Sequence, residues 1–218
     1  LQDGRLLVIN MTSTRIAATK LFIDTLFDSS IVLNVRFTFM GNTEELVYYV
    51  LNRVRTNPRV VHFAIDVSLL TMHFISEIKD ALCGNSSLQS FEYHHNITAQ
   101  SFPNEFVDVL QQKHNIRSFT LGPRFTFYAT ENIAQLVRTN VTSLKKLRFA
   151  FSFHCQYPQG YLEALITNTS LKDVSFAGAR FKKALVSTFT RLFRENKTLE
   201  RLKMPAALLL QHSTQDAH

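Results

Sequence analysis

The chain has 218 residues, of which 45% are hydrophobic and 11% aromatic, and a sequence so apolar buries enough surface to exclude a disordered chain. It has no run of about 18 consecutive apolar residues, so we expect no transmembrane helix. The formal net charge of +7 favours an acidic partner, either nucleic acid, an anionic membrane surface or an acidic protein, with ordinary solubility charge as the alternative reading.

A triad of apolar residues recurs along the whole chain, with its second and third members three and five residues after the first. The first triad is Leu6, Ile9 and Met11, and the last is Leu199, Leu202 and Met204. The triads start at residues 6, 32, 60, 88, 116, 144, 171 and 199, so successive steps are 26 to 28 residues. A repeat of this period indicates an array of similar structural units.

Each unit contains a predicted strand followed by a predicted helix. Alternation within the triads predicts strands near 6–11, 32–37, 60–65, 88–93, 116–121, 144–149, 171–176 and 199–204. The second half of each unit changes to helical spacing. An early example is the stripe of Leu46, Val47, Val50, Leu51 and Val54. Such stripes predict amphipathic helices that pack behind the strands.

Asparagine recurs three or four residues before the next triad, at Asn57, Asn85, Asn140, Asn168 and Asn196. Asparagine tolerates the left-handed backbone conformation that closes a helix, and this predicts its role here. Four of these asparagines also begin Asn-x-Ser/Thr sequences, which their place in the repeat explains without glycosylation.

One strand and one helix cannot bury their apolar faces alone, so neighbouring units must stack. The sequence therefore predicts an α/β solenoid, a horseshoe arc of about seven or eight repeats, with a parallel sheet on the concave face and helices on the convex face. Residues 1–204 form the predicted repeat domain, and residues 205–218 form a cap and loose tail. Most of the 19 phenylalanines fall on triads or helix stripes, which indicates core packing.

The repeat resembles leucine-rich repeats of the ribonuclease-inhibitor type, as in Asn168-Thr-Ser-Leu171-Lys-Asp-Val174. That family usually carries an asparagine eight residues after the first triad residue, where its amide bonds to the backbone of the neighbouring turn. Here only Asn96 conforms, so the turns after the strands must be satisfied differently. The degenerate pattern also looks like the repeat domain of tropomodulin and leiomodin. This resemblance implies an association with the pointed ends of actin filaments.

The side chains that alternate with the triads are predicted to project from the concave face. Their mixed polarity suits a protein partner, with binding energy concentrated in a few anchors, for which Arg36, Phe39, Arg148 and Phe151 are candidates. The complete set of candidate partner-binding residues is Arg36, Phe39, His62, Asp66, Glu92, His94, Lys146, Arg148, Phe151, Arg201 and Lys203.

Two groups on this face invite a more specific reading. The residues His62, Asp66, Glu92, His94 and His95 come from adjacent predicted strands and could form a transition-metal or pH-sensitive patch, although a solvated polar face is the alternative that we adopt. The second group is basic and comes from the last strands. It favours an acidic protein surface over nucleic acid, because no aromatic residues interleave its charges in a known motif.

The sequence contains no phosphate-binding glycine loop and no motif that places a catalytic nucleophile or metal. The two cysteines, Cys83 and Cys155, fit no metal-ligand spacing and suit a reducing compartment, hence an intracellular, cytoplasmic protein. We therefore expect a non-enzymatic protein-interaction module without a cofactor or metal, belonging to a larger protein. A nucleic-acid-associated subunit is the alternative, and the oligomeric state stays open.

Overall fold

A computed structural model describes residues 6–12, 15–67, 74–94, 104–122, 131–149, 158–175 and 185–203. Eight strands and seven helices alternate along these residues. The strands are β1 (Leu7–Thr12), β2 (Leu33–Met40), β3 (Val60–Asp66), β4 (Ser90–His94), β5 (Ser118–Leu121), β6 (Lys146–Phe149), β7 (Asp173–Ser175) and β8 (Arg201–Lys203). The helices are α1 (Ile16–Asp28), α2 (Glu44–Thr56), α3 (Ile75–Gly84), α4 (Asn104–Gln112), α5 (Glu131–Arg138), α6 (Pro158–Thr167) and α7 (Val186–Glu195).

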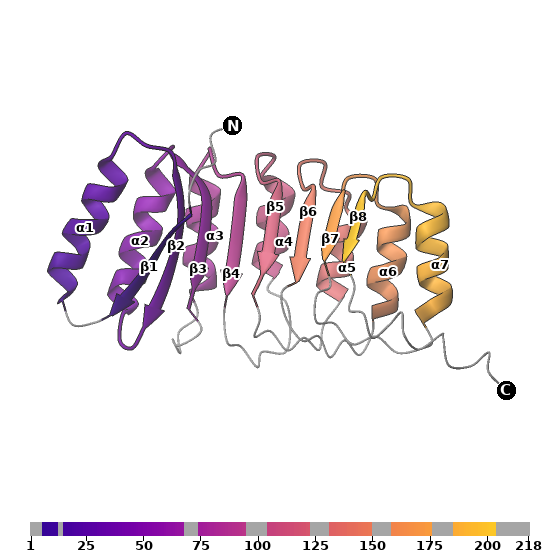
Figure 1. The fold of residues 1–218 in the computed structure, drawn as a ribbon, viewed down its shortest axis with the longest axis horizontal. Coiled ribbons are helices and arrows are strands. Elements are labelled where there is room, and N and C mark those ends of the chain that lie inside the picture. The colour runs from indigo at the N-terminus through magenta and orange to yellow at the C-terminus, as the bar shows by residue number, and fades with distance from the viewer. Residues whose placement is uncertain are drawn as a thin grey trace.

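All eight strands are parallel and lie side by side in chain order, from β1 to β8, in one open sheet. A helix leads from each strand to the next, and each helix packs beside the helix of the neighbouring repeat (Figure 1). Such crossovers through a helix are what parallel pairing requires. The predicted α/β solenoid, with one strand and one helix per repeat, is therefore confirmed.

The apolar triads point into the layer between the sheet and the helices. In β3, β4 and β5 their second and third members are at most 1% exposed. The second repeat departs from the predicted phase, because Val32, its expected first member, is 63% exposed. Leu33 is buried instead and pairs with Val60, and a register irregularity follows it. Asn34 then pairs with His62, so Val61 is an extra residue of β3, and Val35 and Phe63 are in register again.

Aromatic rings form the centre of the core. Phe63, Phe91 and Phe119 occupy equivalent positions on β3, β4 and β5, with ring centroids 5.9 Å and 5.8 Å apart along the row. Phe106 of α4 contacts Phe91 at 5.9 Å and Phe119 at 5.9 Å, which joins the helical layer to the strands. These offset contacts add roughly 0.5–1.5 kcal/mol per pair beyond the burial of area.

The asparagines before the strands link each repeat to the preceding one. The Asn85 amide nitrogen donates to the carbonyl groups of Val54 at 2.7 Å and Asn57 at 2.9 Å, and its oxygen accepts from the N–H of Ser87 at 2.8 Å and of Leu88 at 2.9 Å. Asn168 and Asn196 repeat this pattern. These hydrogen bonds form an asparagine ladder before the strands.

This arrangement corrects the predicted reason for asparagine. Asn57, Asn85 and Asn196 have extended backbones, with φ of −94°, −83° and −75°, so they do not close their helices in the left-handed conformation. Among the described non-glycine residues only Asn140 has a positive φ, of 51°. The prediction is therefore confirmed at Asn140, whereas side-chain hydrogen bonding, rather than tolerance of positive φ, explains Asn57, Asn85 and Asn196.

Candidate functional site

The open face of the sheet, which we define by the outward side chains of β2 to β8, lies opposite the seven described helices (Figure 1). Parallel register aligns these side chains across the strands. One row consists of Asn34, His62, Ser90, Ser118, Lys146, Asp173 and Arg201. The next row consists of Arg36, Ala64, Glu92, Thr120, Arg148, Ser175 and Lys203. A third, shorter row contains Thr38, Asp66 and His94.

The first group of charges on this face is the β2–β4 cluster, made of Arg36, His62, Glu92 and His94. Arg36 forms an ion pair with Glu92 although β3 lies between their strands. The intervening residue of the row is Ala64, and its small side chain lets the guanidinium group pass over β3. His94 Nε2 lies 3.5 Å from one carboxylate oxygen of Glu92, and His62 Nε2 lies 4.0 Å from the other.

These neighbours control ionisation in the β2–β4 cluster. The hydrogen bond with His94, helped by the charges of His62 and Arg36, lowers the pKa of the Glu92 carboxyl to about 2, although partial burial acts in the opposite direction. Burial lowers the pKa of His62, and the nearby Glu92 carboxylate opposes that shift. Arg36 and Glu92 therefore form an ion pair within the cluster, although the buried Nε of Arg36 has no hydrogen-bond partner among the described residues.

Gly122, at the end of β5, makes room for one member of this cluster. A Cβ atom at this position would lie 2.2 Å from Nδ1 of His94, closer than real side chains approach. Ala64 and Gly122 therefore shape the cluster by being small. Neither belongs to the predicted site, because only the register of neighbouring strands shows which side chain crosses each of them.

The second group is the β6–β8 cluster, made of Lys146, Arg148, Asp173, Arg201 and Lys203. One oxygen of the Asp173 carboxylate accepts hydrogen bonds from Arg148 at 2.8 Å and from Arg201 at 3.3 Å. The Asp173 side chain is only 6% exposed, whereas those of Arg148 and Arg201 are 39% and 61% exposed. Asp173 is missing from the predicted site, although it occupies the same position of its repeat as Lys146 and could have been predicted to lie beside it.

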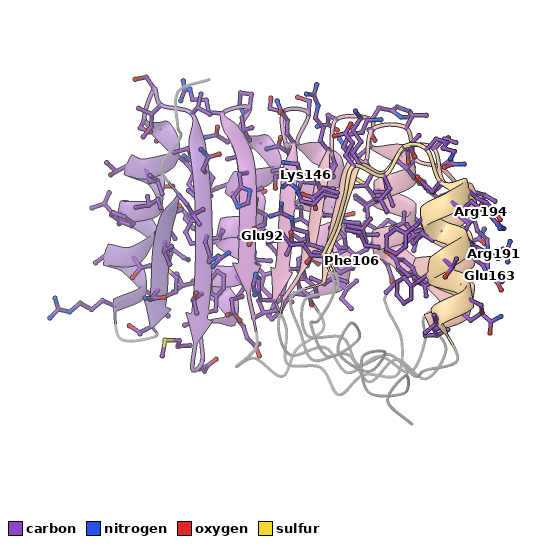
Figure 2. The ribbon with its side chains drawn as sticks, turned by 45° about the vertical axis from the view of Figure 1, so that its right-hand side comes forward. Glu92, Phe106, Lys146, Glu163, Arg191 and Arg194 are labelled. Carbon is purple, nitrogen blue, oxygen red and sulfur yellow. The ribbon has the colours of Figure 1, made fainter. Side chains whose placement is uncertain are left out.

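The two clusters differ in net charge. The β6–β8 cluster has four cationic side chains and one carboxylate, which leaves a net charge of +3. Lys146 and Lys203 are exposed, and no ion pair is found for either within the described residues. Figure 2 shows Glu92 and Lys146 on the strand layer, while Arg191 and Arg194 project from α7. The excess charge of this cluster is therefore presented on the open face.

The structure places nine of the eleven predicted site residues in or beside these clusters, with Asp66 next to His94 in the third row. Phe39 is a correction. It is 0% exposed and stacks on Phe37 in the core with ring centroids 6.3 Å apart, so it is not on the open face. Strand β2 continues past its triad with the same alternation, which turns Phe39 inward. Phe151 lies outside the described residues.

The metal-binding alternative gains no support from the described part of the chain. There, no group of three His, Cys, Asp or Glu side chains has an arrangement that could hold a metal ion. Glu92 instead interacts with Arg36 and His94. His95, the remaining member of that hypothetical patch, lies outside the described residues.

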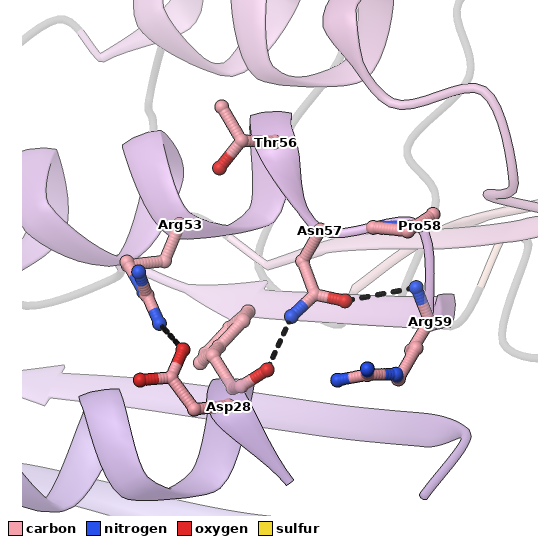
Figure 3. A pocket seen from close by; sticks show the side chains of 7 residues that line it. Asp28, Arg53, Thr56, Asn57, Pro58 and Arg59 are labelled. Atoms are coloured by element: carbon pink, nitrogen blue, oxygen red, sulfur yellow. Dashed lines mark hydrogen bonds and ion pairs between the residues drawn. The ribbon is translucent and has the colours of Figure 1, made fainter. Parts of the chain in front are cut away.

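A pocket of about 330 Å³ lies at the ends of α1 and α2, away from the open face (Figure 3). Its polar groups are engaged with one another. Arg53 pairs with Asp28, Arg59 donates to the Ser29 carbonyl, and the Asn57 amide donates to the Phe27 carbonyl at 2.6 Å. These bonds satisfy backbone carbonyl groups near the end of α1, so the pocket is explained by the joining of repeats.

Fold and open face together define the class of protein, a leucine-rich-repeat-like solenoid. Neither a protein-family model nor a curated protein matches the sequence. Among solved structures, the tropomodulin C-terminal domain of Caenorhabditis elegans is similar, with a TM-score of 0.50 and 16% identity, over 71% of this chain and 91% of that one. At that identity the likeness concerns the fold alone. Within the described residues, no helix has the length and apolar character to span a membrane.

Proposed function

We propose that this chain is a non-enzymatic protein-interaction module, part of a larger protein or assembly, which binds a partner protein through its open face. One observation carries the proposal: the parallel sheet presents aligned rows of polar side chains, with their charges gathered into two clusters. Side chains held on strands are preorganised, and binding then costs less conformational entropy than binding by mobile loops.

The dimensions of the open face suit this use. Six strand spacings of about 4.8 Å separate β2 from β8, so the face is about 30 Å long. An interface of standard size covers about 800 Å² on each partner, and a face of this length can contribute most of it. Solenoids commonly bind partners over such extended surfaces.

The finer assignments belong to the same proposal. The 26- to 28-residue period supports a ribonuclease-inhibitor-type repeat. The resemblance to the tropomodulin and leiomodin repeat domain makes actin the first defined protein to test as the partner. A cytoplasmic location is also proposed, because Cys83, a free thiol that is partly buried, suits a reducing compartment.

A photo-crosslinking amino acid in place of Ser118 on the open face tests the proposal, with the same amino acid in place of exposed Gln135 on α5 as the matched control. Both proteins are illuminated in extracts of the native cells and, separately, with purified actin. We expect protein adducts from the Ser118 position at several times the yield from the Gln135 position. Equal yields from both positions would contradict binding through the open face.

The same experiment tests the alternative of a nucleic-acid-associated subunit, which the net charge of +7 favours. Adducts that disappear after ribonuclease treatment, with binding to heparin that falls steeply with salt, would support that alternative and contradict a protein partner.

A further inference from the structure

The two clusters use the same row of the sheet in different ways. In the β2–β4 cluster the row reads Arg36, Ala64, Glu92, so a cation and an anion meet across a small central residue. Four strands later the same row reads Arg148, Ser175, Lys203. The second arrangement thus has a small central residue between two cations, and the carboxylate is missing.

Asp173 does not supply that carboxylate. It lies in the neighbouring row, and Oδ2 of its buried carboxylate is already engaged with both Arg148 and Arg201, while Oδ1 is buried without a hydrogen-bond partner among the described residues. A guanidinium group has five N–H donors, and the hydrogen bonds found with Asp173 use one from each arginine. Asp173 therefore holds the two guanidinium groups in place, and within the described residues most of their donors have no other acceptor.

Resting on the proposed function, we infer that the β6–β8 cluster binds an acidic segment of the partner protein, with one of its carboxylates above Ser175, between Arg148, Arg201 and Lys203. Lys146, at the opposite corner, takes a second carboxylate. Strands β6 and β8 lie about 10 Å apart, and the two rows lie about 7 Å apart. Carboxylates on alternate residues of an extended segment have a similar spacing, of about 7 Å.

An acidic protein segment fits this surface better than nucleic acid. The open-face side chains of β5 to β8 include no aromatic residue on which a base could stack. Four cations within about 10 Å are also few for the extended track that a nucleic-acid backbone requires. The β2–β4 cluster, whose Arg36 is already paired with Glu92, is expected to contribute little to this binding.

The first test uses a fluorescent peptide that alternates Glu and Thr, with a Gln and Thr peptide as the neutral control, and measures Kd by anisotropy. The double variant Lys146→Glu and Lys203→Glu should weaken binding of the acidic peptide by about tenfold or more. The matched control, Arg55→Glu and Lys197→Glu, makes the same charge change at exposed positions outside the sheet, and it should change Kd by about twofold or less. Circular dichroism checks that every variant is folded.

A second pair of variants tests the position above Ser175. Ser175→Asp places a carboxylate between Arg148 and Lys203 and should weaken peptide binding about tenfold, whereas the neutral Ser175→Asn should weaken it much less. Equal losses for the two variants would overturn the placement. Because Ser175 is only 7% exposed, the Lys146 and Lys203 variant serves as the independent measurement if either variant fails to fold.

Three further outcomes would overturn the inference: equal affinity for the acidic and neutral peptides, equal losses in the sheet variant and its control, or tighter binding of oligo-uridine with the same dependence on the variants. These outcomes are distinguishable from a failure of the proposed function. If protein adducts still form at Ser118 while the acidic peptide does not bind, the open face binds a protein and only the acidic segment is wrong.

Discussion

The first four strands and the last four share a backbone plan but use their side chains differently. Strands β1 to β4 have 6, 8, 7 and 5 residues, whereas β5 to β8 have 4, 4, 3 and 3. The core row that holds Phe63 and Phe91 in the first half continues as Phe119 on β5 and then as Leu147, Val174 and Leu202 in the second. The first half pairs its surface charges internally, and the second leaves an excess of cations. The proposed binding is therefore expected where outward side chains do not satisfy one another.

The junction between the halves also interrupts the asparagine ladder. The position three residues before the triad, which Asn85 and Asn168 occupy, holds Lys113 and Val141 in the two repeats between them, and Asn140 lies one position earlier. Lys113 donates to the Asn85 carbonyl at 3.2 Å and so replaces only part of the amide's hydrogen bonding. The four predictions that follow test whether the first half is held more strongly than the second, from the largest expected effect to the smallest.

Phe91→Ala should lower the free energy of unfolding by about 3–5 kcal/mol, because it removes the ring at the centre of the aromatic row and leaves a cavity. Leu147→Ala, at the equivalent position of β6, should cost about 2–3 kcal/mol. Urea denaturation followed by circular dichroism measures both. Replacing Phe193, which is 61% exposed, provides the control. Equal losses for Phe91 and Leu147 would remove the difference between the halves.

Asn85→Ala should lower the free energy of unfolding by about 2–3 kcal/mol, because two carbonyl groups and two N–H groups of the backbone lose their partner in a site only 2% exposed. Lys113→Ala should cost about 1 kcal/mol or less, since one hydrogen bond to a neutral carbonyl is lost. Hydrogen exchange of the Ser87 and Leu88 amides should accelerate in the first variant only. Unchanged exchange there would mean that the ladder does not join the repeats.

The β2–β4 cluster should make the free energy of unfolding decrease at acidic pH. The folded chain lowers the pKa of Glu92 from 4.5 to about 2, so the stabilisation is present above pH 4.5 and is lost as the pH falls toward 2. Glu92→Gln should therefore cost about 1–2 kcal/mol at neutral pH, since the carboxylate is partly screened by water, and the difference from wild type should shrink through that window. Urea denaturation across this pH range measures it.

His62 provides an internal control for the pH profile. Its pKa lies below the ordinary 6.5 in the folded chain, so the unfolded chain takes up a proton first, and stability falls as the pH drops below 6.5. His62→Gln should flatten this earlier loss and leave the acid loss of Glu92 largely in place. A profile without dependence on either residue would show that the cluster is more solvated than its geometry indicates.

Glu200→Gln should change the free energy of unfolding by about 0.5 kcal/mol or less. Its partner Lys172 lies 2.5 Å away, but both side chains are more than half exposed, at 53% and 65%. Water screens such a pair, and holding two long side chains in place costs entropy. Thermal unfolding detects the shift, and a loss above about 1 kcal/mol would mean that the last repeats depend on surface ion pairs more than the first.

The sequence by itself determined the solenoid, because the burial of alternate triad residues and of the helix stripes depends on local spacing alone. The same alternation could have placed Phe39 in the core, since it lies two residues beyond Phe37 on one strand. Strict alternation along β2 also favours Leu33 over Val32, because Leu33 lies on the same face as Val35 and Phe37, but the three-residue step of the other triads pointed to Val32.

Only the tertiary structure decided which polar side chains satisfy one another. Arg36 reaches Glu92 from 56 positions away in the sequence, and the Asn85 amide reaches the Val54 carbonyl from 31 positions away. Both contacts form when separate repeats stack in one register. The small residues Ala64 and Gly122 leave room for the side chains of Arg36 and His94 from neighbouring strands. The asparagine ladder, the paired first cluster and the anchoring of two arginines by Asp173 are therefore properties of the stack, since hydrogen bonds and ion pairs need atoms that only stacking brings together.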